Sequence, residues 1–364
     1  MRITKVSGLV YRQRIHHREA VLLGGTVSRP WHETVLVRVD TDEGLTGWGE
    51  AFGHFGVAST TLEALTQIVA PRCAGQDVLD DGLLPGLERT LHLLGASGPV
   101  VYALSGLDIA LWDLRGKAAG KPVHALIASH AATSLPAYAS LIRYHAPEVV
   151  ASECREALSR GYAAVKLHEV DLAAIGAAAG VLRPTRTPLM VDVNCAWDLS
   201  QARAASRAMA TFDVRWLEEP IWPPDDHATL AALRDSTSVP VAAGENAASV
   251  GDLERLIAGH ALDFVQPSVT KLGGIAALCR IAACAARHGV LVTPHSPYFG
   301  PGLLATIHVC AALAPGAWIE HLFYDLEEGP FDAGTVPREG RFAVPQAPGL
   351  GIEPNLAILE NHST

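Results

Sequence analysis

The sequence predicts a parallel α/β barrel behind a smaller α+β domain, and three observations predict it. The chain has 364 residues, of which 49% are apolar and 18% charged, so it can bury one large core and a smaller one. From about residue 136 onward, short apolar runs alternate with alanine-rich helical stretches, which is typical of parallel strands joined by helices. Before that point the pattern is first that of antiparallel strands and then that of amphipathic helices.

The first domain begins with a strand-like region over residues 1–58. Within it, residues 34–40 and 46–50 flank a turn-rich connection, which predicts an antiparallel hairpin. The polar, glycine-rich stretch from His16 to His32 predicts a mobile loop whose histidines are solvated. Residues 59–119 carry a helical pattern that ends near glycines, and we expect the whole α+β domain to span residues 1–125.

Eight candidate strands follow, and their spacing leaves room for a helix between neighbours, which implies a closed barrel. An open doubly wound sheet is the alternative, but no glycine-rich nucleotide loop follows a strand, and Gly273-Gly274 lacks the spacing of one. We expect the barrel to span residues 126–324 and the Gly- and Pro-rich segment 325–364 to pack back on the first domain. The predicted strands cover residues 137–141, 163–168, 189–194, 214–218, 239–244, 264–267, 290–294 and 318–320.

The bulk composition excludes several classes of partner. A net charge of −10 argues against nucleic acid and against anionic membranes, which both need a basic face. The six cysteines include no CxxC pair and are predicted to be reduced packing residues. The N-terminus lacks the apolar core of a signal peptide, and no apolar run is long enough to span a bilayer, so we expect a cytoplasmic protein.

Three acidic motifs at nearly even spacing carry the strongest functional signal. Asp192, Glu218 and Glu245 each end an apolar run, and 26 and then 27 positions separate them. That interval corresponds to one strand, one helix and two loops, so the three acids are predicted at the carboxyl ends of successive parallel strands. Three converging carboxylates are typical of a hard divalent cation, and the sequence therefore predicts an Mg²⁺ site.

Other chemically able residues follow neighbouring predicted strands. Lys166 and His168 are two positions apart and are expected on the same side of the second strand. His295 ends the seventh strand and is expected on the opposite flank of the acids. A cation at the acids can bind a substrate carboxylate and stabilise the enediolate that forms when its α-proton is removed. Asn194, Ser268, Lys271, Glu320 and His321 also lie at predicted strand ends.

Taken together, these motifs resemble the mandelate racemase and muconate lactonizing enzyme family of the enolase superfamily. Asp192-Val193-Asn194, Glu218-Glu219-Pro220 and Gly244-Glu245-Asn246 are similar to the family's three metal-ligand motifs, and 108–117 is similar to the last capping-domain helix. The resemblance implies a modified (β/α)₇β TIM-type barrel with an α+β capping domain. It also implies Mg²⁺, a small-molecule carboxylate substrate and a homo-oligomer.

The resemblance also assigns expected roles to single residues. Lys166 and His168 match the strand-two Lys-x-Lys base motif, His295 matches the strand-seven histidine of the racemase branch, and Glu320 matches the glutamate that hydrogen-bonds a substrate carboxylate. Asn194, Ser268 and Lys271 are further candidates for substrate binding. The stretches 16–32 and 47–56 resemble the family's two substrate-capping loops, which makes Trp48 and His54 candidates for substrate binding or for plain packing.

Two departures from the family pattern bear on the reaction. Ser268 stands where the racemase branch has aspartate and the lactonizing branch has lysine, and His168 replaces a second lysine. Because racemisation needs a competent base on each face, both changes favour an acid-sugar or hydroxy-acid dehydratase, which works with one base and one acid. A racemase, epimerase or cycloisomerase is the alternative. A metal-assisted hydrolase and a non-catalytic metal- or ligand-binding barrel are the rivals outside this chemistry, and the three all-carboxylate ligands argue against the hydrolase.

Overall fold

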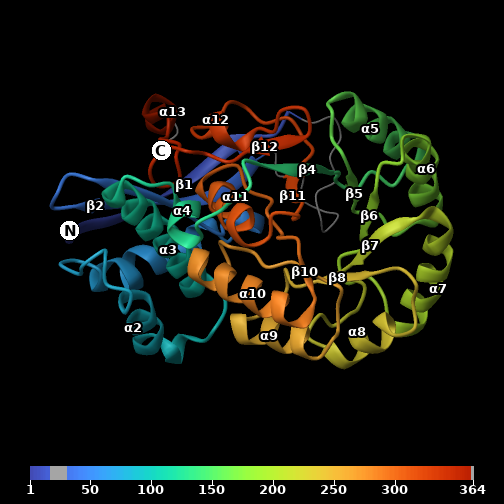
Figure 1. Cartoon of the computed structure of the whole chain (residues 1–364), viewed down its shortest axis with the longest axis horizontal. Helices are drawn as coiled ribbons and strands as arrows, with labels where there is room; N and C mark the ends of the chain where they lie inside the picture. Colours follow the sequence, from blue (N-terminus) through green and yellow to red (C-terminus); the bar gives the residue numbers. More distant parts are fainter. Residues whose placement is uncertain (17–30, 362–364) are drawn as a thin grey trace.

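The computed structural model describes residues 1–16 and 31–361 and contains two parts, a capping part and a barrel (Figure 1). Most of the predicted loop between His16 and His32, including His17, lies outside the described residues. His32 is described, and the prediction that it is a solvated loop residue is wrong. It belongs to a strand, is 6% exposed, and its Nδ1 lies 2.8 Å from the hydroxyl of Tyr324.

The capping part contains the predicted antiparallel hairpin as part of a three-stranded sheet. Strands β1 (Ile3–Arg14), β2 (Trp31–Thr41) and β3 (Thr46–Ala51) pair in that order, and helix α3 (Pro99–Ala119) covers the sheet. Glycines allow the close contact between α3 and β3, because a Cβ on Gly49 would lie 1.9 Å from the carbonyl oxygen of Gly106. The other capping helices are α1 (Ala58–Glu63), α2 (Leu83–Thr90) and α4 (Val123–Ile127).

Eight parallel strands form a curled sheet, as predicted. The order along the sheet follows the order along the chain from β4 to β10, and the last strand, β11, pairs with the first, β4. At the remaining seam the hydroxyl of Thr293 donates to the carbonyl oxygen of Trp318 over 3.2 Å. This arrangement is a barrel and excludes the open doubly wound sheet, whose strand order would reverse. The strands are β4 (Ser134–Ser140), β5 (Val165–Leu167), β6 (Leu189–Asp192), β7 (Val214–Glu218), β8 (Val241–Ala243), β9 (Phe264–Val265), β10 (Leu291–Val292) and β11 (Ile319–Leu322).

A helix follows each of the first seven barrel strands, which gives the (β/α)₇β pattern. Several of these helices begin at a side-chain cap. Asp198, for example, accepts a hydrogen bond from the backbone of Gln201 in a full capping box. Inside the barrel, large side chains such as Tyr138, Met190 and Trp216 pack into a closed layer. The helices are α5 (Pro147–Ser159), α6 (Leu172–Leu182), α7 (Leu199–Met209), α8 (His227–Arg234), α9 (Val250–Ala258), α10 (Gly274–His288) and α11 (Pro301–Leu313).

Buried acids of the capping part hold the barrel by capping two of its helices. Asp108 on α3 accepts a hydrogen bond of 3.1 Å from Ala276 N near the start of α10. Glu50 on β3 accepts one of 2.8 Å from Gly302 N in the first turn of α11. Carboxylates at helix N-termini satisfy free N–H groups and favour the helix dipole, so these contacts fix the capping sheet against the barrel.

The C-terminal segment contacts both parts of the molecule. Strand β12 (Arg341–Ala343) pairs with β4, and Leu350 N donates to the carboxylate of Asp113 on α3 over 2.8 Å. Helices α12 (Asp332–Thr335) and α13 (Leu356–Asn361) flank this strand in the sequence.

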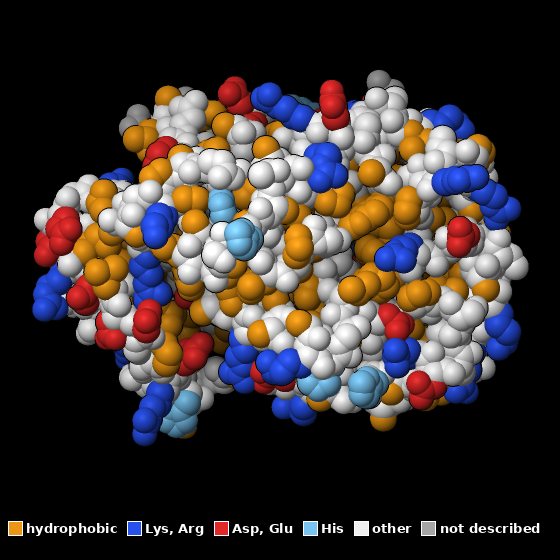
Figure 2. Space-filling view, viewed as in Figure 1, with side chains coloured by type: hydrophobic (Ala, Val, Ile, Leu, Met, Phe, Trp, Pro, Cys, Tyr) orange, Lys and Arg blue, Asp and Glu red, His pale blue; other side chains and the backbone are white. Residues whose placement is uncertain are grey.

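On the face drawn in Figure 2, hydrophobic side chains gather over the middle of the barrel, and both acidic and basic side chains lie around the rim. This face therefore has no continuous basic surface of the kind that nucleic acid requires. None of the described helices is long and apolar enough to cross a membrane.

Candidate active site

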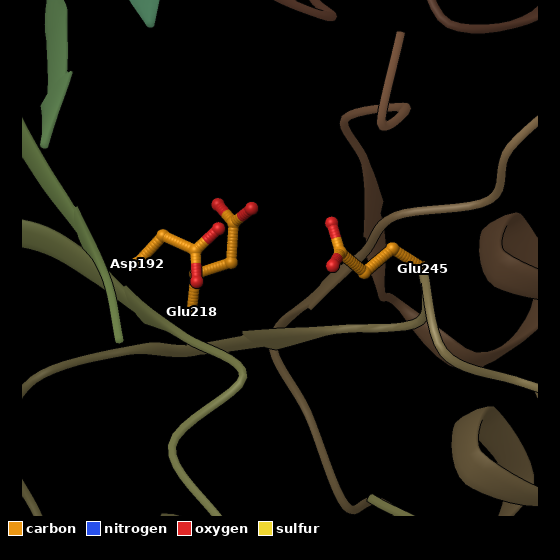
Figure 3. A group of neighbouring side chains, drawn as sticks. All are labelled: Asp192, Glu218 and Glu245. Carbon is orange, nitrogen blue, oxygen red and sulfur yellow. The ribbon is translucent and has the colours of Figure 1, made fainter. Parts of the chain in front are cut away.

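The three predicted metal ligands converge at the carboxyl ends of adjacent strands. Asp192 is the last residue of β6, Glu218 is the last of β7, and Glu245 lies two residues beyond β8. One carboxylate oxygen from each lies within 4.8 Å of the others, and Asp192 and Glu218 are fully buried. In Figure 3, Asp192 and Glu218 point toward each other, and Glu245 faces them from the opposite side.

The residues of this cluster fit a hard divalent cation. All three donors are carboxylates, which is the ligand type that Mg²⁺ prefers. Asp192 Oδ2 is buried and makes no hydrogen bond within the described residues, and side-chain nitrogens of His168 and Lys166 lie 3.4 and 3.6 Å from it. A buried carboxylate oxygen without a hydrogen bond is costly, and a bound cation would remove that cost.

Lys166 lies in the middle of the carboxylates. It is fully buried on β5, and its Nζ is 2.6 Å from Glu218 Oε1, 2.9 Å from Glu320 Oε1 and 3.6 Å from Asp192 Oδ2. Burial by itself lowers the pKa of Lys166, but the negative charges of Glu218 and Glu320 outweigh burial and raise it well above the usual value. In the chain alone, Lys166 is therefore held as a cation by its acidic neighbours.

Glu320, predicted at the end of the eighth strand, lies in β11 and is held from two sides. Its Oε1 accepts hydrogen bonds from Lys166 and, over 2.7 Å, from the hydroxyl of Ser140, and its Oε2 accepts one of 3.0 Å from Ser296 N. Burial raises the pKa of Glu320, but the positive charge of Lys166 outweighs burial and lowers the pKa to about 2. The carboxylate therefore stays ionised beside the lysine.

His168 lies on the Lys166 side of the cluster. Its Nδ1 contacts the carbonyl oxygen of Leu141, so Nδ1 carries a hydrogen, and its Nε2 lies 3.4 Å from Asp192 Oδ2. The expectation that Lys166 and His168 share one side of the strand agrees with these contacts, because both reach the same oxygen of Asp192.

His295 lies on the Glu245 side. Its Nε2 is 2.9 Å from Glu245 Oε2, and its Nδ1 is 2.7 Å from the hydroxyl of the fully buried Ser268. Burial raises the pKa of Glu245, but His295 and Lys271 together lower it to about 2. Ser268 therefore orients the imidazole, and it does so with a neutral group.

The remaining predicted binding residues lie at different distances from this centre. Asn194 has φ +48° and donates its backbone N–H to Asp192 Oδ1 over 2.8 Å. Lys271 donates to the carbonyl oxygen of Glu245 over 2.6 Å, and burial lowers its pKa. His54 stacks on Phe52, and the Lys271 ammonium lies 5.1 Å from the centre of the Phe52 ring.

Trp48 packs against Phe331 of the C-terminal segment, with Arg38 over its ring, and is 8% exposed. Its backbone N–H donates to Asp113 on α3, so the contacts of Trp48 with Asp113, Phe331 and Arg38 lie in the capping part and the C-terminal segment and match the packing alternative.

Several site residues were not predicted from the sequence. Trp216 Nε1 donates to Glu218 Oε2 over 2.9 Å, which fixes the second oxygen of that carboxylate. Ser140 and Arg143 come from the end of β4 and the loop after it, the one strand end for which no residue was proposed. The signal existed, because the rule that barrel function lies at the carboxyl ends of strands applies to the first strand as well.

Comparisons with known proteins agree with this geometry. Residues 12–128 match the family model for the N-terminal domain of mandelate racemase / muconate lactonizing enzyme, and residues 149–358 match the enolase C-terminal domain-like model. The chain is 32% identical to D-galactarolactone cycloisomerase from Agrobacterium fabrum, over 88% of this chain and 89% of that protein. It is 30% identical to L-talarate/galactarate dehydratase from Salmonella typhimurium, over 87% of this chain and 79% of that protein.

A solved structure is similar along the whole chain. It is the crystal structure of a mandelate racemase/muconate lactonizing protein from Paracoccus denitrificans complexed with magnesium, and the match has 29% identity and a TM-score of 0.86. It covers 100% of this chain and 98% of that one.

Proposed function

We propose that this chain, which belongs to the mandelate racemase / muconate lactonizing enzyme family of the enolase superfamily, is an acid-sugar dehydratase that depends on Mg²⁺. In this reaction the enzyme removes the α-proton of a carboxylate substrate, and the β-hydroxyl then leaves as water. The product enol rearranges to a 2-keto-3-deoxy acid. The observation that carries the proposal is Lys166, fully buried between the metal-ligand acids and Glu320.

Asp192, Glu218 and Glu245 would hold the cation. When bound, Mg²⁺ stabilises the negative charge that develops on the substrate carboxylate. Its positive charge also lowers the pKa of Lys166, which the acids by themselves raise. The chain's own residues then divide the remaining work. Glu320 keeps Lys166 in position at 2.9 Å, and Trp216 holds the second oxygen of Glu218.

Lys166 is proposed as the base that takes the α-proton, and His295 as the acid that protonates the departing hydroxyl. Their contacts support this division, because Lys166 touches Glu218 and Asp192 whereas His295 touches Glu245. A substrate bound between them then has its α-carbon toward Lys166 and the hydroxyl of the next carbon toward His295. His168, with Nε2 near Asp192, is proposed to position that acid or to share the proton with Lys166.

Cycloisomerisation is the second candidate, because a relative at 32% identity is named as a cycloisomerase. It shares the first step, proton removal next to a carboxylate. Racemisation is less favoured by the geometry, since Nδ1 of His295 faces the neutral Ser268 hydroxyl and not a carboxylate that would strengthen the ring as a base from that side.

We also propose the division into a capping domain over residues 1–125, a barrel over 126–324 and a C-terminal segment over 325–364. The family models, which match residues 12–128 and 149–358, support the first boundary. A homo-oligomer of this chain is part of the same proposal, and light scattering at several protein concentrations tests it.

The experiment is a panel of acid sugars in D₂O with Mg²⁺. A dehydratase forms a 2-keto acid that semicarbazide detects, a racemase exchanges the α-hydrogen without forming one, and a binding protein does neither. Lys166→Ala should abolish both exchange and product. The proposal fails if the wild-type chain exchanges no α-hydrogen on any member of the panel, or if Lys166→Ala keeps full activity.

A further inference from the structure

Arg143 is a cation at the mouth of the barrel whose hydrogen-bond partners among the described residues are all neutral. It lies in the loop after β4 and is half-buried. Its Nε donates to the carbonyl oxygen of His168 over 2.6 Å, and one terminal nitrogen donates to Asn194 Oδ1 over 3.3 Å. Within residues 1–16 and 31–361, no carboxylate forms an ion pair with it. Glu169, the acid next to His168, instead accepts hydrogen bonds from Tyr144 N and from His145 N.

The lysines of the mouth differ from Arg143 in this respect. Lys166 is surrounded by three carboxylates. Lys271 is bound to the carbonyl oxygen of Glu245, and the negative charges of Glu245 and Glu219 act on it. Arg143 therefore carries the positive charge at this mouth that the chain's own acids leave least compensated. A half-buried guanidinium with unused N–H groups is the group that binds a carboxylate best, because two parallel hydrogen bonds match its shape.

The location of Arg143 suits the far end of a substrate bound at the acids. It is linked to Asp192 by two routes: through Asn194, whose N–H donates to Asp192 Oδ1, and through His168, whose Nε2 lies 3.4 Å from Asp192 Oδ2. Arg143 is thus one residue removed from the metal-ligand cluster. In a six-carbon diacid, five C–C bonds of about 1.5 Å separate the carboxyl carbons by roughly 6 Å. This exceeds the 4.8 Å within which the three ligand oxygens lie, so the far carboxylate of such a substrate extends beyond the cluster to the residues around it.

We propose that Arg143 binds a second carboxylate of the substrate, at the end opposite the carbon that loses its proton. This inference rests on the proposed function and narrows it, because it makes the substrate an aldaric acid, with a carboxylate at each end, rather than an aldonic acid with one. Arg143 then selects for the diacid by supplying a charge-assisted bidentate contact that a terminal hydroxymethyl group does not use fully.

A purely structural role for Arg143 makes a different prediction. Its bonds to His168 and Asn194 also tie together the chain segments that follow β5 and β6. If that were its whole function, its loss would disturb the catalytic centre for every substrate to the same extent. A selective loss on diacids is therefore the result that separates the two roles.

The test uses acid sugars in matched pairs, each pair sharing one configuration and differing only in whether the last carbon is a carboxylate or a hydroxymethyl group. Galactarate and galactonate are one such pair. We expect the wild-type enzyme to have a higher kcat/KM for a diacid than for its partner. In Arg143→Gln, kcat/KM for the diacid should fall by about ten- to hundredfold, mostly through KM, and that for the monoacid should change little.

Two further variants sharpen the comparison. Arg143→Lys keeps the charge but not the fork, so it should recover part of the diacid preference. Arg183→Gln is the matched control, because Arg183 also donates a hydrogen bond to a backbone carbonyl oxygen, that of Thr211. Arg183 precedes β6, whereas Asp192 lies at the carboxyl end of that strand. Arg183→Gln should leave both activities unchanged. Titration calorimetry of galactarate into Mg²⁺-loaded Lys166→Met, with and without Arg143→Gln, measures the same contact without turnover.

The outcomes distinguish this inference from the proposed function. If the wild-type chain acts on monoacids and prefers them, or if Arg143→Gln lowers kcat/KM equally for both members of a pair, the role of Arg143 is refuted while the dehydratase stands. If the wild-type chain exchanges no α-hydrogen on either kind of acid, the proposed function itself is refuted.

Discussion

Replacing Lys166 by methionine removes a cation that contacts three buried carboxylates. Its contacts with Glu218, Glu320 and Asp192 span 2.6 to 3.6 Å, and all four side chains are at most 1% exposed. Removing one partner of a buried ion pair leaves charge uncompensated and costs about 3–5 kcal/mol. In a chelator, the free energy of unfolding of Lys166→Met should therefore be lower than that of the wild type by an amount in this range.

Magnesium should reduce this difference. A ligand at 100 times its dissociation constant stabilises the folded state by about 2.7 kcal/mol. In Lys166→Met the cation also supplies positive charge that the acids have lost, so the variant should gain more from Mg²⁺ than the wild type. The measurement is urea unfolding of both proteins in EDTA and in saturating Mg²⁺, followed by circular dichroism. Exchange of the substrate α-hydrogen should fall by at least about 10²- to 10⁴-fold in the same variant.

Lys117→Met is the matched control for this experiment. Lys117 also forms an ion pair with a buried acid, Asp113, at 2.8 Å, but it lies on α3 of the capping part. Its loss should lower the free energy of unfolding by the same amount with and without Mg²⁺. The reasoning is refuted if Lys166→Met is as stable as the wild type in EDTA, or if Mg²⁺ narrows the gap for Lys117→Met as much as for Lys166→Met.

Two further predictions follow from buried polar contacts. Burial raises the pKa of Glu50 from 4.5 to about 7, although Thr34 and Gly302 N donate hydrogen bonds to it. The unfolded chain therefore loses this proton at a lower pH than the folded chain does. As a result, the free energy of unfolding falls as pH rises from 4.5 to about 7. Relative to the wild type, Glu50→Gln should therefore gain about 3 kcal/mol between pH 4.5 and pH 8 in urea unfolding, and an equal dependence in both proteins would contradict this. Ser268→Ala removes the hydroxyl that orients His295 at 2.7 Å, and should slow keto-acid formation about tenfold while α-hydrogen exchange changes less. Equal slowing of both steps would argue against His295 as the acid.

The fold could be predicted because the barrel strands have a strong local signal. Each of the eight predicted runs overlaps a strand of the barrel, although most observed strands are shorter, as β9 is at Phe264–Val265 against the predicted 264–267. The strands end early because the residues beyond them turn toward the mouth. Asn194 and Cys195, for example, have positive φ just after β6.

The convergence of Asp192, Glu218 and Glu245 could be predicted because the interval between them equals one strand–helix unit, and position along a barrel fixes position in space. His32 was mispredicted for the opposite reason. Its burial depends on a long-range contact with Tyr324, 292 residues away in the chain, which no local pattern records. Glu50 was missed for the same reason, since its importance comes from the N-terminus of α11.

The roles of individual side chains were harder to predict than their locations. Whether a barrel-mouth residue binds metal, substrate or a neighbour depends on small differences in interatomic distance, and sequence spacing does not determine these differences. Arg143 illustrates this, because its interest arises from the absence of an ion pair within the described residues rather than from any motif.

Direct measurement of Mg²⁺ binding tests the central claim that Asp192, Glu218 and Glu245 form one cation site. Titration calorimetry of the wild-type chain should show one Mg²⁺ per chain, and Asp192→Asn, Glu218→Gln and Glu245→Gln should each weaken binding at least about tenfold. Glu169→Gln is the control, because Glu169 is equally buried at the same mouth but accepts hydrogen bonds only from Tyr144 N and His145 N among the bonds described. No binding by the wild type, or equal weakening in Glu169→Gln, would contradict the account.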